Sequence, residues 1–470
     1  MTTDVIIVGA GISGLATAYE LSRRGVSFVI LERGPRAGGV VLNEHVDGFT
    51  IDAGPDAVLT QKPEAIALCR ELGLGDRLTP TRPPRVAYIQ REGRLHPLPA
   101  ASVLGIPTAI RPFLATRLFS WPGKLRMAGE LFVPARRDGA DESIAHFVGR
   151  RFGDEAVTYL AEPLLAGIHA GDVDRLSIRA LFPRLVQAEE QHGSLLRAFH
   201  RVRRPQGAHE SAFVSLPGGL SELVQALVHS LPVGALRAAS PVTRVATVGT
   251  AFQVRTAREA CDARSVVLST PAFVTSALIQ SVDPALAQLC AEIPYASAAT
   301  VALGFEQTAI GHPLNGSGFV VPRVERSGIL AASWLSSKWP HRAPEGRVLL
   351  RTFIGGARDP DALRHSDEEL VDRSLRALTP LLAIRGGPLL TRVYRFERAN
   401  AQHEVGHLAR LDAIESRLAL HPGLFVTGSG FRGTGIPDCV ADGRATARSV
   451  AAFLAKGFTT EITEETRRGR

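Results

Sequence analysis

The sequence predicts an α/β fold, and three observations lead to this prediction. Residues 4–9 are a short apolar run rich in β-branched residues, which is typical of a strand buried on both faces. Three glycines follow within a few residues, and residues 15–21 then place apolar side chains at helical spacing. A second apolar run over residues 27–31 ends in an acidic residue. This order of strand, glycine turn, helix and strand indicates a parallel sheet packed against helices.

Composition excludes several other classes of protein. The chain has 470 residues, of which 45% are hydrophobic and 21% charged, so a disordered or fibrous protein is excluded. Its 45 glycines and 30 prolines indicate many tight turns. No apolar run reaches the ~18 residues of a spanning helix. The first residues also lack the basic segment of a secretion signal. We therefore expect neither a membrane-spanning nor a secreted protein.

The cysteines and the charge restrict the partners. The four cysteines lie far apart, with no Cys-x-x-Cys pair and no histidine at the spacing of a metal ligand. We therefore expect no metal site, no disulfide framework and a reducing, cytoplasmic location. The net charge of +8 is compatible with nucleic acid, a membrane surface or an anionic substrate. Because no nucleic-acid-binding module accompanies this charge, we expect a membrane surface or an anionic substrate.

The glycine turn after the first strand predicts a dinucleotide site. Gly9 permits the tight turn, Gly11 lets the backbone approach a pyrophosphate, and Gly14 allows close packing of helix and strand. The helix N-terminus offers free N–H groups and a partial positive charge to the phosphates. Glu32 ends the second strand, where its carboxylate can accept hydrogen bonds from ribose hydroxyls. The turn also contributes Ala10, Ile12 and Ser13 to the predicted site.

The residues after Glu32 distinguish between two dinucleotides. Residues 32–39 have the pattern Glu-Arg-x4-Gly-Gly, which resembles FAD-binding oxidoreductases of the glutathione-reductase and amine-oxidase type. Residues 49–55 are similar to the segment that leads to the flavin in those proteins. The resemblance implies FAD as the cofactor. It adds seven residues to the predicted cofactor site: Arg33, Gly38, Gly39, Ala53, Gly54, Pro55 and Asp56.

A second glycine-rich element near the end of the chain predicts the other half of the flavin site. Residues 424–427 are typical of a buried strand, a glycine-rich turn follows, and residues 439–454 have helical spacing. In related flavoproteins such a helix N-terminus is aimed at the flavin ring, where reduction builds negative charge. The predicted contacts are Gly428, Ser429, Thr434, Gly435 and Ile436. Residues 241–245 and 265–271 resemble strands of the same domain, with Val242 contacting adenine through its backbone.

Several longer motifs resemble the protoporphyrinogen oxidase family over residues 4–455. They are residues 54–59, 162–172, 176–177, 318–322, 405–408 and 433–439, in the family's order. Two positions depart from the family pattern. Asp56 stands where some members carry Asn, and His403 lies where a Pro-Gln-Tyr run often precedes the Gly-His pair. The resemblance implies an FAD-dependent enzyme of heme biosynthesis that oxidises a porphyrinogen with dioxygen, releasing hydrogen peroxide.

The resemblance also implies residues for the substrate. Arg85 matches the position that binds a propionate, and Gly167 the one whose carbonyl faces pyrrole N–H groups. Phe319 and Val320 are expected to line the macrocycle. The cofactor carries the chemistry, so we expect no catalytic side chain. We favour protoporphyrinogen as the substrate. Coproporphyrinogen III, which carries four propionates rather than two, is the alternative.

The resemblance implies a discontinuous Rossmann-like FAD-binding domain, a mixed-sheet substrate domain and an α-helical insert. We place the FAD-binding domain at residues 1–84, 210–286 and 402–458, the substrate-binding domain at 85–100 and 287–401, the helical insert at 101–209 and a flexible tail at 459–470.

The helical insert is the predicted membrane contact. Residues 101–137 combine apolar side chains with six Arg or Lys against one acid. This composition predicts peripheral contact with the inner face of the cell membrane, although an ordinary basic surface would have the same composition. The remaining expected partners are a ferrochelatase that receives the product and a second copy of the chain in a homodimer.

Two rival functions stay open. One is another enzyme of the superfamily, an amine oxidase or a carotenoid desaturase. Amine oxidases commonly hold a lysine near the flavin, and only Lys338 falls in that region, in a run that we predict to be a loop. The other rival is a flavin-bearing protein that binds porphyrin or a protein partner without turnover.

Overall fold

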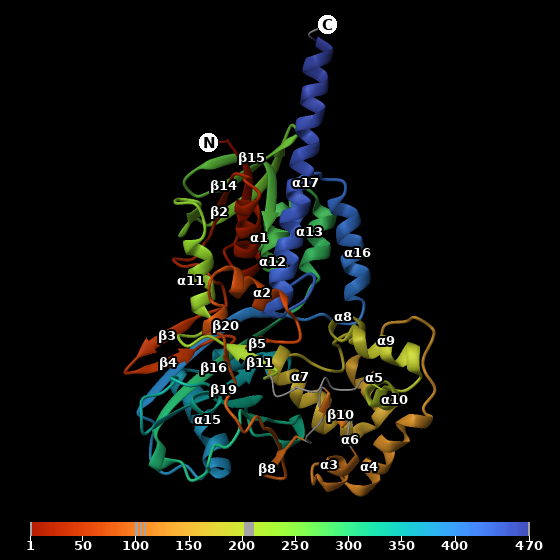
Figure 1. Cartoon of the computed structure of the whole chain (residues 1–470), viewed down its shortest axis with the longest axis vertical. Helices are drawn as coiled ribbons and strands as arrows, with labels where there is room; N and C mark the ends of the chain where they lie inside the picture. The colour runs from red at the N-terminus through yellow and green to blue at the C-terminus, as the bar shows by residue number, and fades with distance from the viewer. Residues whose placement is uncertain (1, 99–101, 104–105, 108–109, 202–210, 469–470) are drawn as a thin grey trace.

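The computed structural model describes residues 2–98, 102–103, 106–107, 110–201 and 211–468. Figure 1 shows an upper part in which helices flank a sheet, a second sheet at the lower left and a group of helices at the lower right. The two ends of the chain lie in the same upper part (Figure 1). This mixture of sheets and helices confirms the predicted α/β fold class.

The first sheet has seven strands, and its central strand is buried on both faces. Its order is β12-β2-β1-β15-β14-β13, and β21 pairs with β15. Neighbours β12, β2, β1, β15 and β21 run parallel, whereas β14 is antiparallel to both β13 and β15. The strands are β1 Thr2–Val8, β2 Phe28–Leu31, β12 Leu236–Arg237, β13 Val242–Val248, β14 Ala251–Thr256, β15 Ala260–Leu268 and β21 Leu424–Val426.

Alternation along β1 explains how this sheet is covered. Val5 and Ile7 belong to one apolar cluster, which includes residues of α1, α2, α11 and α17. Ile6 and Val8 belong to a second cluster, with residues of α12, α13 and α16. Because successive side chains point to opposite faces, the apolar run buries both faces under helices. These helices are α1 Ile12–Arg23, α2 Glu64–Glu71, α11 Ser221–His229, α12 Ala272–Ile279, α13 Pro284–Ala291, α16 His407–Leu418 and α17 Ile436–Arg468.

The second sheet is mixed and also has seven strands, in the order β20-β16-β19-β18-β17-β7-β8. Only the β17–β7 pair within it is parallel. The helix α15, Asp367–Leu382, packs on it and begins with a capping box between Ser366 and Glu369. The strands are β7 Ala87–Arg91, β8 Arg94–Pro97, β16 Tyr295–Glu306, β17 Gly318–Val320, β18 Ala331–Trp334, β19 Arg347–Gly355 and β20 Leu390–Ala401.

The third region is mostly helical and has its own apolar core. Its helices are α3 Ile110–Ala115, α4 Trp121–Ala128, α5 Ile144–Phe152, α6 Asp154–Ala156, α7 Glu162–His169, α8 Ile178–Leu181, α9 Pro183–His192 and α10 Leu195–Arg201. A pair of two-residue strands, β9 Ser102–Val103 and β10 Ile106–Pro107, precedes them. The start of the predicted helical insert is therefore partly extended.

Short elements join the three regions. They are β3 Asn43–Val46, β4 Phe49–Asp52, β5 Val58–Leu59, β6 Thr79–Pro80, β11 Phe213–Ser215 and α14 Leu335–Lys338. The helix α17 continues to Arg468, so it includes much of the segment 459–470, whose flexibility stays a prediction. The predicted domain limits also stay predictions. Among the described residues, no helix combines the length and the apolar character needed to cross a bilayer.

Candidate functional site

Two glycine-rich turns from opposite ends of the chain meet at one edge of the first sheet. The strands β1, β15 and β21 are parallel neighbours, so the turns after β1 and β21 leave the sheet at the same edge. The helices α1 and α17 begin at these turns, and both N-termini therefore lie at that edge. A Cβ on Gly443 of α17 would lie 2.4 Å from the Ser13 oxygen, which shows how closely the two helices cross. An anionic or electron-rich group at this edge would meet two helix N-termini.

Backbone conformation and packing within the protein require glycine at positions 9 and 14, whether or not a cofactor is bound. Gly9 has a φ of +99°, and a Cβ there would lie 2.7 Å from the oxygen of Ser269. A Cβ on Gly14 would lie 2.1 Å from the oxygen of Gly9. These two glycines permit the turn and the close packing of α1 on the strand, as the sequence predicts.

No contact within the described residues requires glycine at position 11. Its φ is −70°, which any residue adopts, and a Cβ there would meet no atom of the described residues within 4 Å. A Cβ on Gly39 would lie 3.5 Å from the Cα of Gly11, so the two predicted cofactor glycines border the same space. The residues at this edge therefore fit a dinucleotide whose pyrophosphate approaches the backbone at Gly11.

The carboxylate of Glu32 lies beside the first turn. It accepts hydrogen bonds from the backbone N–H groups of Ala10 and Gly34, both at 2.8 Å. Each carboxylate oxygen can accept a further hydrogen bond, so this position is compatible with the predicted ribose contact. The backbone N–H of Ser240 donates to the backbone carbonyl oxygen of Glu32 at 2.7 Å. Val242, two residues further along the chain, is the first residue of β13, and its contact with adenine stays a prediction.

Arg36 is a structural residue of the site that the sequence did not single out. Its guanidinium donates to the oxygens of Ala37 and Val41, both at 3.0 Å, and of Gly39 at 2.8 Å. Burial lowers the pKa of Arg36. Although Arg36 and the predicted Arg33 are both exposed, the hydrogen bonds of Arg36 fix the backbone around the predicted Gly38–Gly39 pair. The only feature of the sequence that could have indicated this role of Arg36 is its position between Glu32 and the two glycines.

The carboxylate of Asp56 is engaged by the protein. It accepts hydrogen bonds from Lys338 Nζ at 2.6 Å, Arg351 Nη2 at 2.7 Å and Trp339 Nε1 at 2.8 Å. Burial alone would raise the pKa of Asp56, but the cations of Lys338 and Arg351 hold it well below its usual range. The Asp56 carboxylate is thus held in place by three donors of the protein.

The same cluster orders the predicted segment before Asp56. Arg351 Nη1 donates to the carbonyl of Gly54 at 2.6 Å, and Thr300 donates to that of Ala53 at 2.8 Å. Pro55 lies between Gly54 and Asp56 and is half-buried. The prediction that Lys338 lies in a loop was wrong, because it is the last residue of the helix α14.

The second turn is held by carboxylates at the start of α17. Asp442 accepts from Thr427 Oγ1 at 2.6 Å and from the backbone of Gly428 at 3.1 Å. Asp438 accepts from the backbone of Gly435 at 3.3 Å and pairs with Lys62 at 2.6 Å. Two further predicted residues lie here, because Ile436 begins α17 and the hydroxyl of Thr434 is 3.3 Å from His169 Nδ1.

The predicted substrate residues are only partly brought together. A Cβ on Gly167 would lie 3.2 Å from Val320 Cγ1, so these two residues face each other between α7 and β17. Gly167 lies in the last turn of α7, where carbonyls have no partner within the helix. Arg85 is exposed, and its Nε donates to the oxygen of Thr81 at 3.0 Å.

Phe319 requires a correction to the predicted substrate surface. It is 2% exposed and belongs to the core of the second sheet, whereas Val320 packs against the core of the helical region. Neighbouring residues of a strand point to opposite faces, so the two cannot line the same side of β17. The contacts of Phe319 and Val320 with the macrocycle stay predictions, and the structure allows at most one of the two on a given side of β17.

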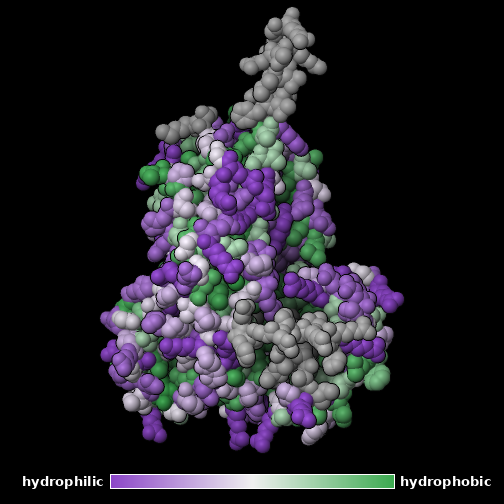
Figure 2. All heavy atoms as spheres, viewed as in Figure 1, coloured by the Kyte–Doolittle hydropathy of each residue, from purple (hydrophilic) through white to green (hydrophobic). Residues whose placement is uncertain are grey.

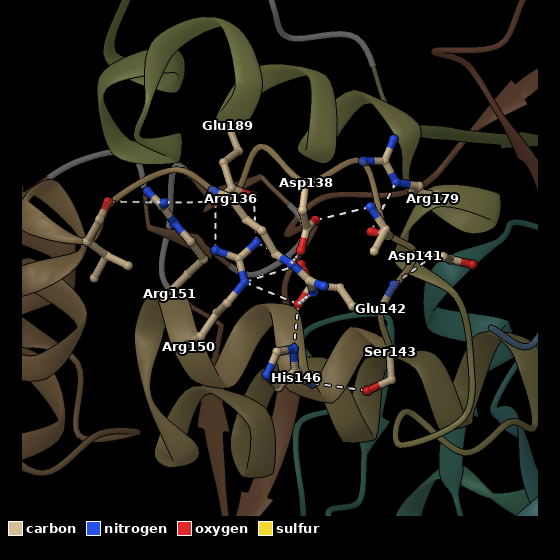
Figure 3. A network of polar contacts seen from close by, with 12 residues as sticks. Arg136, Asp138, Asp141, Glu142, Ser143, His146, Arg150, Arg151, Arg179 and Glu189 are labelled. Carbon is tan, nitrogen blue, oxygen red and sulfur yellow. Dashed lines mark hydrogen bonds and ion pairs between the residues drawn. The ribbon is translucent and has the colours of Figure 1, made fainter. Parts of the chain in front are cut away.

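A small charged depression lies in the helical region, and Arg136, Glu142, Arg150 and Glu189 are among its lining residues. Figure 3 shows the charged network around it. Arg150 Nη2 lies 2.7 Å from both Glu142 and Glu189, and Arg151 Nη1 lies 3.0 Å from Glu189. Arg136 lies 3.3 Å from Glu142. These cations and carboxylates neutralise one another, which indicates a role in holding helices together.

Comparisons with known proteins agree with this geometry. The family described as flavin containing amine oxidoreductase matches residues 12–451. The coproporphyrinogen III oxidase of Bacillus subtilis is 35% identical over 96% of this chain and 98% of its own length. The chloroplastic protoporphyrinogen oxidase of Nicotiana tabacum is 28% identical over 96% of this chain and 86% of its own length.

A solved structure is also similar. An Exiguobacterium sp. 255-15 protein, provisionally assigned as a protoporphyrinogen oxidase, is 32% identical with a TM-score of 0.85. The match covers 95% of this chain and 98% of that one. The similarity therefore extends over all three regions of the fold.

Proposed function

Because this chain belongs to the flavin-containing amine oxidoreductase family, we propose that it oxidises coproporphyrinogen III to coproporphyrin III in heme biosynthesis, with dioxygen as the electron acceptor. The observation that carries the flavin part of the proposal is the open approach at Gly11, beside two helix N-termini. The observation that carries the substrate part is the similarity to the Bacillus subtilis coproporphyrinogen III oxidase over nearly the whole chain.

The choice of substrate differs from the one that we favoured on sequence. The lipid-compatible character of the helical insert favours protoporphyrinogen, with coproporphyrinogen III as the alternative. The bacterial relative named for coproporphyrinogen III is more similar to this chain than the plant relative named for protoporphyrinogen. The basic composition, with +8 net charge, also suits a substrate with four carboxylates.

The residues of the chain bind and orient, and the bound FAD supplies the acceptor for a hydride. The turn at Gly11 and the carboxylate of Glu32 would hold the dinucleotide. The carbonyl of Gly167 would accept a hydrogen bond from a pyrrole N–H, and Val320 would exclude water from one face of the macrocycle. Arg85 would bind a propionate through a charge-assisted hydrogen bond. These contacts would fix the bridging carbon in one position.

The environment of Lys338 disfavours the amine-oxidase rival. Its ammonium is bound to the buried carboxylate of Asp56 at 2.6 Å, and it lies 5.1 Å from the ring centre of Trp339. An ammonium engaged with a buried carboxylate and an aromatic ring is already bound within the protein, unlike a lysine that is free to hold a water beside a flavin. Activity on a polyamine with none on a porphyrinogen would nevertheless favour that rival.

We also propose that the helical region contacts the membrane surface. Trp121, Leu125 and Phe132 are 65%, 72% and 86% exposed, in and just after α4. Figure 2 shows apolar residues at the lower right of the molecule, where Figure 1 places α3 and α4, whereas hydrophilic residues cover much of the rest of this face. Exposed aromatic and aliphatic side chains on a basic segment suit an anionic lipid surface. Cosedimentation with anionic vesicles tests this part separately.

The function is tested by offering each porphyrinogen separately to the purified protein and following porphyrin fluorescence. We expect faster turnover of coproporphyrinogen III than of protoporphyrinogen IX. Faster turnover of protoporphyrinogen IX would favour that compound as the substrate. No turnover of either porphyrinogen would refute the proposal. Anaerobic mixing with the substrate should bleach the flavin absorbance close to stoichiometrically. A flavin-bearing protein that only binds porphyrin would stay yellow.

A further inference from the structure

Two stacked histidines contact the second glycine turn. His403 follows β20, and His407 begins α16. Their ring centres are 3.9 Å apart and their planes differ by 10°. Nε2 of His403 lies 3.0 Å from the oxygen of Ser429, and Nε2 of His407 lies 2.9 Å from the oxygen of Phe431. A carbonyl oxygen only accepts, so each imidazole donates from Nε2 to the turn.

Burial favours the neutral form of both rings. Burial lowers the pKa of His403 to about 3, and burial likewise lowers the pKa of His407. A proton on either ring would also face the other ring at stacking distance. The pair therefore acts through its two Nε2–H donors and not through its charge.

His407 has a polar atom that packing alone does not explain. Its Nδ1 is buried and has no hydrogen-bond partner among the residues that the structure describes. An unpaired buried acceptor destabilises the fold, and an apolar side chain of similar size would avoid that cost. Unlike an apolar side chain, the imidazole of His407 donates a hydrogen bond from Nε2 to the Phe431 carbonyl.

Residues 402–405, the segment that includes His403, are hydrogen-bonded to the helical region. The oxygen of His403 accepts from the backbone of Ser177 at 2.8 Å, and Gln402 Nε2 donates to the oxygen of His169 at 3.0 Å. The backbone of Val405 donates to the oxygen of Arg175 at 2.9 Å. These hydrogen bonds fix the backbone that carries His403, from which its ring donates to the turn.

Fixing a carbonyl also fixes the neighbouring N–H group. Because the peptide group is planar and trans, the direction of the Ser429 carbonyl sets the opposite direction of the Gly430 N–H. The Phe431 carbonyl sets the Arg432 N–H in the same way. We propose that His403 and His407 are positioning residues for the flavin, because their paired donors fix the peptide planes of the turn that the flavin meets. The inference rests on the flavin site alone, so it is independent of which substrate the enzyme oxidises.

The test uses the holoenzyme and three variants. The variant His403→Leu removes one donor, and His403→Gln loses the stack but keeps an N–H donor. The variant His312→Leu is the matched control, because His312 is a half-buried histidine that packs on Trp334 in the second sheet. The measurements are the FAD dissociation constant, the visible spectrum of the bound flavin and its midpoint potential.

We expect His403→Leu to weaken FAD binding about tenfold, as loss of one buried hydrogen bond would. It should also change the flavin spectrum and potential. His403→Gln should recover most of the affinity, and His312→Leu should leave all three flavin measurements unchanged. A folded His403→Leu variant with wild-type FAD affinity and potential would overturn the proposal.

The Gln variant decides the matter if His403→Leu does not fold. Near wild-type FAD affinity of His403→Gln would support the role of the donor. A tenfold loss would overturn it, because the stack and not the hydrogen bond would then matter. Failure of His403→Gln to fold would also overturn it, since a residue that only orients the turn is not required for the fold. FAD binding needs no porphyrinogen, so failure here differs from failure of the proposed reaction.

Discussion

Substitution of Gly11 by Ala separates the needs of the cofactor from the needs of the fold. The backbone of Gly11 has φ −70° and ψ 177°, which alanine adopts without strain. A Cβ there would meet no atom of the described residues within 4 Å. The methyl group would instead occupy the space through which the pyrophosphate approaches the backbone. We therefore expect Gly11→Ala to fold normally and to bind FAD poorly.

The expected effect on the apoprotein is small because two terms oppose each other. Gly11 is the N-cap of α1, and alanine is a poorer cap by about 0.5–1 kcal/mol. Removing a glycine lowers the entropy of the unfolded chain, which stabilises the fold by about 0.4–1 kcal/mol. The free energy of unfolding of the apoprotein should thus change by less than about 0.5 kcal/mol. A displacement of the dinucleotide by about 1 Å should weaken its binding ten- to a hundredfold, or about 1.4–2.7 kcal/mol.

Calorimetric titration of the apoprotein with FAD, together with urea unfolding, measures both quantities. The control is Gly387→Ala, because Gly387 has no positive φ and a Cβ there would also meet nothing within 4 Å. This control should bind FAD as the wild type does. Gly14→Ala should instead destabilise the fold, since its Cβ would lie 2.1 Å from the Gly9 oxygen. Wild-type FAD affinity of Gly11→Ala would refute the placement of the cofactor.

Three further predictions concern pH, the helical region and the substrate. Burial lowers the pKa of His169 to about 4 and that of His403 to about 3, so the unfolded chain takes up protons that the folded chain refuses below about pH 6.5. The free energy of unfolding, measured by urea unfolding, should be highest above that pH. It should fall by about 1.4 kcal/mol per histidine per pH unit toward pH 4. A free energy of unfolding that rises on acidification would contradict this. The variant Glu189→Gln should lower the free energy of unfolding by about 3 kcal/mol, because it removes a charged partner from the buried Arg151 and the half-buried Arg150. The variant Glu190→Gln, on an exposed pair, should lower it by less than about 1 kcal/mol. Equal losses in thermal unfolding would contradict the network's role. Arg85→Ala should raise the KM for the porphyrinogen about tenfold with unchanged flavin content, and loss of the flavin colour would mean that its role is misplaced.

Local pattern is enough to predict the elements that carry the cofactor. The first strand, the glycine turn and the first helix follow from residues adjacent in the chain, and the structure has them as β1 and α1. The second glycine turn follows from the same pattern near the other end. That both turns lie at one edge of one sheet could be inferred only from the family resemblance, because pairing between β15 and β21 leaves no mark in either strand alone.

Other features depend on contacts that no local pattern encodes. The face of Phe319 could not be predicted, because β17 has only three residues and its alternation is too short to read. The role of Arg36 could not be predicted, because one arginine among so many has no distinguishing context. The two-residue strands β9 and β10 pair with each other, in a stretch where the family resemblance implied a helical insert.

The cluster at Asp56 gives a physical reason for one departure from the family pattern. Lys338 and Arg351 lie 282 and 295 residues further along the chain, and their side chains are 14% and 1% exposed. With Asn at position 56, which some family members carry, two poorly solvated cations would share a neutral partner, at a cost of several kcal/mol. Aspartate at this position and lysine at 338 therefore depend on each other. The lysine that would suggest an amine oxidase is accounted for by the buried charge it neutralises, beside the segment that leads to the flavin.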